Sequence, residues 1–134
     1  MSDVLIRQML EARLAAMPGG LPTVWQNKAP SAMFNAAAPH QKAFLLRAKN
    51  QALGLSEKSS ARRGILQVTL CYPTGNGTGA AEAQAVAVQE WFPSGLVLEK
   101  NGVHVRVRGA PSIGDPIETS PYTIPVSISY HSIF

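Results

Sequence analysis

Apolar side chains recur at helical spacing in two stretches of the chain. Residues 3–17 carry an apolar stripe that faces away from their charged residues, and Pro18-Gly19-Gly20 ends the stretch. Residues 80–92 repeat the pattern in an Ala-rich segment. The positions expected to be buried in this second stretch are Ala81, Ala85, Val88 and Phe92. The pattern therefore predicts two amphipathic helices.

From residue 43 onward the period changes to two, which is typical of strands that bury one face. Phe44 and Leu46 lie on one side of this strand and Arg47 and Lys49 on the other. We expect the apolar pair to face the core and the two cations to face solvent. Residues 66–72 alternate in the same way. Because a short polar segment joins the two runs, we expect them to pair as a long antiparallel hairpin.

Asn101-Gly102 stands between two further apolar runs, residues 96–100 and 103–108. This dipeptide favours the two-residue turn of a β-hairpin, because both of its residues readily adopt a positive φ. In the second arm, the residues expected to face the core are Val103, Val105 and Val107. Those expected to face solvent are His104, Arg106 and Arg108. The hairpin thus presents a second row of basic side chains.

The remaining segments comprise one short strand, two irregular connections and one long strand. Residues 23–26 form the short strand, and residues 29–40 and 111–121 are rich in proline and small or polar residues, as surface connections are. Residues 122–131 alternate with a period of two up to the end of the chain. Pro125 has no N–H to donate to a ladder, so this strand is expected to lie at a sheet edge or to carry a bulge there.

The predicted element order is α-β-β-β-α-β-β-β. Strands joined by hairpins, with two helices between them, favour an α+β fold with a mostly antiparallel sheet and both helices packed on one face. The chain has 134 residues and no second composition block, so we expect residues 1–134 to form one domain. A chain of this length buries enough surface to fold without disulfides or a structural metal. Cys71, the only cysteine, is expected to be a small core or strand residue.

The charge balance is only moderately basic. Twelve Lys and Arg against eight Asp and Glu give a net charge of +4, less than a dedicated nucleic-acid-binding domain normally carries. The excess is concentrated between Lys42 and Arg63, where six cations accompany one anion. The N-terminus has no basic leader with a long apolar run, and no stretch approaches the roughly 20 apolar residues of a membrane span. We expect a soluble protein that is not secreted by a cleaved signal.

No set of residues matches a catalytic or metal-binding pattern. The loop from Gly75 to Gly79 lies between a strand and a helix, as phosphate-binding loops do, but Ala80-Ala81 follows it where a Walker loop needs Lys and Ser or Thr. A looser dinucleotide fingerprint would need a parallel doubly wound sheet, which these strands cannot build. His40, His104 and His131 are scattered over three segments, unlike metal ligands. We therefore expect no enzymatic activity, no cofactor and no metal.

The candidate interface consists of the basic residues on the predicted outer strand faces, namely Arg47, Lys49, His104, Arg106 and Arg108. Opposed charges set the docking register of a protein partner more than they raise its affinity. The alternative is a small nucleic-acid-binding module in which these side chains track phosphates. That alternative is disfavoured because aromatic residues are few and do not alternate with these charges. Outward charges also keep strand edges from uncontrolled pairing.

Several segments together resemble the tail terminator-like proteins of long-tailed phages and prophages. They are Trp25-Gln26-Asn27, Arg63-Gly64-Ile65-Leu66-Gln67-Val68, Tyr72-Pro73-Thr74-Gly75, Trp91-Phe92-Pro93 and the strand from Tyr122 to Tyr130. The similarity covers nearly the whole chain. Its most distinctive piece is Arg-Gly-Ile-x-Gln-Val followed by Pro-x-Gly.

This resemblance implies a structural virion protein without catalytic residues. The subunits would form a hexameric ring that docks on the last ring of tail tube protein, stops further tube polymerisation and presents a surface to head-completion proteins. Such a protein is assembled in the bacterial host cytoplasm and ends in the virion tail. The implied partners are further copies of the chain, the tube protein and the head-completion proteins, with no membrane and no requirement for nucleic acid.

Overall fold

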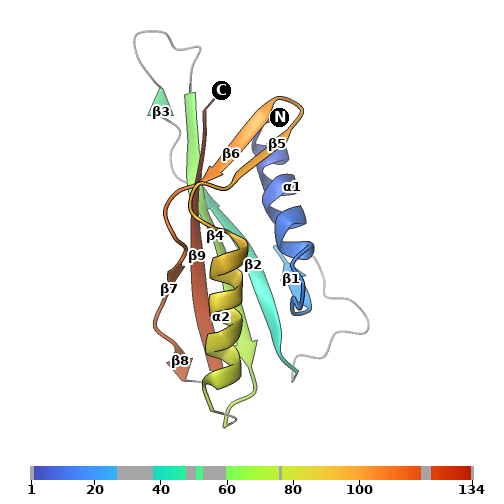
Figure 1. The fold of residues 1–134 in the computed structure, drawn as a ribbon, viewed down its shortest axis with the longest axis vertical. Coiled ribbons are helices and arrows are strands. Elements are labelled where there is room, and N and C mark those ends of the chain that lie inside the picture. Colours follow the sequence, from blue (N-terminus) through green and yellow to red (C-terminus); the bar gives the residue numbers. More distant parts are fainter. Residues whose placement is uncertain are drawn as a thin grey trace.

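The computed structural model describes residues 2–26, 38–47, 51–52, 60–75, 77–118 and 122–133. The elements in chain order are α1 (Ser2–Ala15), β1 (Thr23–Trp25), β2 (His40–Arg47), β3 (Gln51–Ala52), β4 (Ser60–Tyr72), α2 (Gly79–Trp91), β5 (Val97–Lys100), β6 (Val103–Val107), β7 (Ser112–Ile113), β8 (Ile117–Glu118) and β9 (Tyr122–Ile133). Within these ranges the chain has two helices and a mostly antiparallel, curled sheet (Figure 1). It is therefore an α+β protein.

The sheet is built around the two longest strands, β4 and β9. The strand order is β1-β2-β4-β9-β6-β5, with β1 parallel to β2 and the other pairs antiparallel. The predicted pairing of the strand at residue 43 with residues 66–72 is confirmed, since β2 pairs with β4. The other edge of β9 is occupied in turn by β6, β7 and β8. The connection expected to be irregular over 111–121 thus contributes two short strands.

The prediction that the last strand lies at an edge, or bulges at Pro125, is wrong, because β9 is a central strand with continuous pairing to β4. The Pro125 carbonyl accepts a hydrogen bond from the Gly114 amide at 2.8 Å. The N–H that proline lacks would point to the same side as this carbonyl. On that side the ladder is interrupted between β7 and β8, so no donor is missed. The interruption therefore lies between β7 and β8, and β9 itself is continuous.

The even-numbered residues of β4 and β9 form the inner face of the sheet, which packs against α2. The fully buried residues of this face include Leu66, Val68, Leu70, Ile124, Val126 and Ile128. The predicted stripe of the second helix is confirmed, since Ala81, Ala85, Val88 and Phe92 are all buried. The inward orientation of Val103, Val105 and Val107 is confirmed as well. Residues of α1, which contacts β5 and β6, complete the same core.

On β2, the prediction that Phe44 and Leu46 face the core is wrong. Their side chains are 39% and 51% exposed, whereas Ala43 and Leu45 are 1% and 6% exposed. Each set of alternate positions on this strand contains two apolar residues, so alternation alone does not decide which set is buried. Pairing with β4 decides it, because Ala43 lies opposite the core residue Val68.

Two local features explain why particular residues stand where they do. Asn101 and Gly102 have φ values of 52° and 81°, as the predicted tight turn between β5 and β6 requires. Gly64 leaves room for its cross-strand neighbour Tyr130, since a Cβ at residue 64 would lie 2.7 Å from the tyrosine hydroxyl. The glycine of the Arg-Gly-Ile segment is therefore required by packing.

Arg13 and Trp91 join the two helices. The Arg13 guanidinium donates two hydrogen bonds to the Trp91 carbonyl, at 3.1 and 2.7 Å, and lies 3.9 Å from the centre of the indole ring. In return the indole N–H donates to the Arg13 carbonyl at 2.6 Å. Trp91 thus serves helix packing, and the cation offsets the partial negative charge at the end of α2.

Candidate interface

The structure separates the five basic residues predicted to form the interface. His104 and Arg106 lie on β6, Arg108 follows it, and all three are exposed as predicted. Arg47 is exposed at the end of β2, and two strands, β4 and β9, separate it from the β6 row. It alternates with the outward Leu46, so it lies on the opposite side of the sheet from the one predicted. Lys49 lies outside the described residues.

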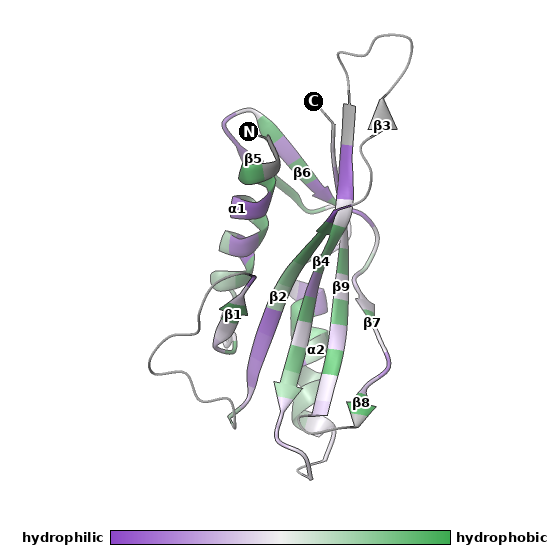
Figure 2. Cartoon of the chain, turned by 180° about the vertical axis from the view of Figure 1, so that it is seen from behind, coloured by the Kyte–Doolittle hydropathy of each residue, from purple (hydrophilic) through white to green (hydrophobic). Residues whose placement is uncertain are grey.

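The odd-numbered residues of β4 and β9 form the outer face of the sheet, together with the exposed Phe44 and Leu46 of β2. In Figure 2, which views the molecule from behind, β2, β4 and β9 lie in front of α2. The outer face is therefore the side of these strands turned away from α2. It mixes cations, small polar residues and partly exposed apolar residues such as Ile65.

Three basic residues stand side by side on this outer face. Arg63 of β4 lies opposite His131 of β9, and His131 lies opposite Arg106 of β6. Like charges placed directly opposite each other on neighbouring strands repel and lower stability. Sequence reasoning missed Arg63 and His131 as members of this row, because they are distant in the chain and only the strand register aligns them.

The environment of His131 reflects this crowding. Burial lowers the pKa of His131, and the positive charges of Arg108 and Arg106 lower it further. Its Nδ1 atom is buried and has no hydrogen-bond partner among the described residues. The arrangement therefore favours the neutral imidazole and leaves the arginines as the charged groups of the row.

The predicted interface residue His104 differs from its neighbours because it has an acidic partner. Its Nε2 atom lies 3.2 Å from a carboxylate oxygen of Glu99 on β5. By contrast, Arg63, Arg106 and Arg108 make no ion pair within the described part of the chain. These three arginines are therefore among the exposed cations that a partner could contact.

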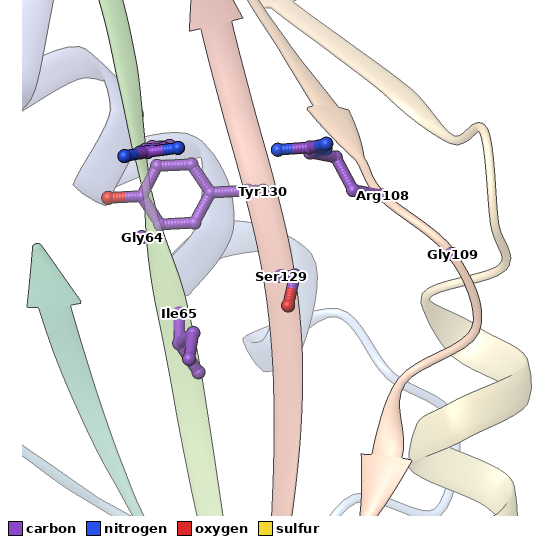
Figure 3. Close-up of a pocket in the computed structure, with 7 residues that line it drawn as sticks. Gly64, Ile65, Arg108, Gly109, Ser129 and Tyr130 are labelled. Atoms are coloured by element: carbon purple, nitrogen blue, oxygen red, sulfur yellow. The ribbon is translucent and has the colours of Figure 1, made fainter. Parts of the chain in front are cut away.

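An open hollow of about 510 Å³ lies between Arg63 and Arg108. Ile65, Ser129 and Tyr130 contribute to its lining, and Figure 3 shows the Arg108 side chain extending toward β9. Arg108 is held against β9 because its backbone N–H donates to the Ser129 carbonyl at 2.8 Å. The site thus combines partly apolar walls with a cation on each side, which suits an apolar group flanked by anions.

The other candidate sites show no chemistry of their own. Thr78 at the start of α2 makes no side-chain capping hydrogen bond. No group of three or more His, Cys, Asp or Glu residues that would suit a metal occurs in the ranges described above. Burial raises the pKa of the Cys71 thiol, and nearby Lys42 lowers it to a smaller extent. No described helix is long and apolar enough to cross a membrane.

The model of the phage tail terminator protein family matches residues 5–130 of this sequence. The chain belongs to the phage tail terminator family. A solved structure with 32% sequence identity superposes on it with a TM-score of 0.80, covering 100% of this chain and 97% of that one. None of the curated proteins compared with the chain matches it. The family resemblance inferred from the sequence segments is therefore confirmed.

Membership makes this tail terminator a structural component of the virion tail that acts with tail and head proteins. The family is structural and not enzymatic.

Proposed function

We propose that this tail terminator forms a hexameric ring on the end of the tail tube, stops tube polymerisation and provides the surface that joins the tail to the head. The family match over residues 5–130 supports this role. The observation that carries it is a set of exposed arginines on one face of the sheet that make no ion pair with any described residue, namely Arg63, Arg106 and Arg108. A monomer gains nothing from holding like charges together, whereas an assembly can neutralise them.

Termination by a ring follows from the geometry of head-to-tail assembly. In head-to-tail assembly, each added subunit or ring presents a new copy of the binding surface, so growth continues. Growth stops when a different protein occupies the last surface and presents no such copy. A capping ring must therefore match the tube on one side and differ from the tube on the other. No cofactor is needed for this, and we propose that residues 1–134 act as one domain, assembled in the host cytoplasm.

The predicted interface charges Arg106 and Arg108 are proposed as contact charges in this assembly, with Arg47, Lys49 and His104 as further candidates. Charges of this kind speed encounter and set register more than they raise affinity. Their loss should therefore affect assembly more than folding.

Tube length tests the proposal. Tail tube protein is polymerised with and without the tail terminator, and tube lengths are measured by electron microscopy. We expect an excess of the wild-type protein to shorten the tubes and an Arg106→Glu, Arg108→Glu double variant to have little effect. Lys42→Glu is the matched control, because it reverses a charge on β2, outside the arginine row. Tubes whose length ignores an excess of folded wild-type protein would contradict the proposed function.

A further inference from the structure

We propose that neighbouring subunits of the ring contact each other head to tail, with the acidic outer stripe of α2 from one copy seated in the arginine-flanked hollow of the next. The acidic stripe is Glu82, Val86 and Glu90, and the hollow lies between Arg63 and Arg108. The partner is thus a second copy of this chain. This inference rests on the proposed ring and names the surfaces that close it.

The acidic stripe is an exposed row on the side of α2 that does not face the core. Glu82, Val86 and Glu90 are spaced four residues apart, so they lie on one side of the helix. All three are exposed, and Val86 is 43% exposed. In the described part of the chain neither glutamate makes an ion pair, and α2 carries no Lys or Arg.

Glu90 is placed against the preference of its own helix. It stands in the last turn of α2, which has no basic residue of its own, and a negative charge there is disfavoured by the helix dipole. Arg13 offsets part of the negative charge at this end of α2, and a cation supplied by a second copy would offset more of it, as an anion would relieve the repulsion within the arginine row.

The two surfaces match in size and in the order of their groups. Glu82 and Glu90 are eight residues apart, which is about 12 Å along a helix. Arg63 and Arg108 lie on either side of β9, two strand spacings apart across the sheet and two residues apart along β9, which together give about 12 Å. Between the acids stands an apolar side chain, and between the arginines lies the hollow to which Ile65 contributes. Each surface thus has an apolar centre between two charged groups. The charges are negative on the stripe and positive at the hollow, so the two surfaces are complementary.

Their placement suits a ring and not an isolated dimer. The stripe lies on the exposed side of α2, and the hollow opens at the arginine-bearing outer side of the sheet that α2 covers from within. Two complementary surfaces on opposite sides of one subunit produce a heterologous contact, which closes when successive rotations complete a circle. Each copy would then use both surfaces.

Charge reversal tests this pairing through rescue. We expect an Arg63→Glu, Arg108→Glu variant and a Glu82→Lys, Glu90→Lys variant each to lose the ring and to run as the 14.3 kDa monomer in light scattering. Mixed in equal amounts they should regain the ring mass. In a ring that alternates the two variants, half of the contacts join two unchanged surfaces and the other half join two reversed surfaces, so every contact pairs opposite charges. Lys42→Glu and Glu11→Lys, which reverse charges outside the two surfaces, should leave the ring unchanged.

The remaining outcomes separate this inference from the ring itself. Variants that still form rings, or that fail to recover ring mass on mixing although folded by circular dichroism, overturn the pairing and leave the ring proposal standing. An arginine variant that forms rings but no longer shortens tubes would show that the hollow meets the tube. If the wild-type protein stays monomeric both in solution and when cross-linked on tube ends, the ring and the pairing fail together.

Discussion

The two faces of β4 and β9 are built from alternate residues of the same strands, yet they differ completely. On the inner face, Val68 and Val126 lie opposite each other with 0% exposure. On the outer face, His131 lies between Arg63 and Arg106, and burial and the positive charges of Arg108 and Arg106 lower its pKa. The residues of the inner face are buried by packing within the folded monomer. The outer face instead gathers arginines that make no ion pair among the described residues, and for this reason the proposed function places contacts with other proteins there.

The largest expected effect comes from placing a charge on the inner face. Val68→Asp should unfold the protein, because a buried, unpaired carboxylate costs several kcal/mol against a total stability of roughly 5–15 kcal/mol. Gln67→Asp, on the neighbouring outer position, should leave the protein folded. Thermal unfolding followed by circular dichroism compares the two. An unchanged melting temperature in Val68→Asp would break the distinction between the faces.

On β2, adjacent leucines sharpen the same comparison. Leu45→Ala should lower the free energy of unfolding by about 2–5 kcal/mol, because Leu45 is only 6% exposed and its truncation leaves a cavity in the core. Leu46→Ala should cost about 0.5 kcal/mol or less, since that side chain is already half exposed. Chemical denaturation measures both. Equal losses would mean that the assigned register of β2 is wrong.

The helix contact between Arg13 and Trp91 should contribute less than the core but more than a surface charge. Arg13→Ala removes two hydrogen bonds to the Trp91 carbonyl and a cation–π contact, and should cost about 1–3 kcal/mol. Arg7→Ala, which removes an ion pair with Glu11 on the same helix, should cost about 0.5 kcal/mol or less. Denaturation curves in which Arg7→Ala loses more stability than Arg13→Ala would contradict this account.

The smallest expected effect is a pH dependence that belongs to the outer face. Because the pKa of His131 is lowered in the folded protein, the unfolded chain binds a proton more readily. This group therefore lowers stability as pH falls from about 7 to about 5, and its contribution vanishes above its unfolded pKa of about 6.5. His131→Gln should flatten the pH dependence of the melting temperature.

The arginines can be tested as a cause of that shift. Arg108→Gln or Arg106→Gln should raise the pKa of His131, because each removes a repelling charge, and NMR titration of the imidazole measures the change. Lys42→Gln, outside the row, serves as the control. A pKa that does not move in either arginine variant would leave burial as the sole cause.

Residue patterns predicted much of the fold because burial follows periodicity where only one side of an element is apolar. For this reason the burial of the α2 stripe and of the inward valines of β6 was predicted correctly. The choice between Leu45 and Leu46 was not, since both sides of β2 are apolar. The basic residues of β6 were recognised as exposed, but their neighbours Arg63 and His131 were not recognised as part of the same row.

By itself, the sequence determined the α+β class, the two helices, the Asn101-Gly102 turn and the family, because these depend on local periodicity, turn conformation and short segments. Only the tertiary structure decided that β9 is central, that Arg63, His131 and Arg106 align, and that Arg63 and Arg108 line one hollow. Those features depend on strand register and order. Register joins residues far apart in the chain, and no local pattern records which residues will face each other.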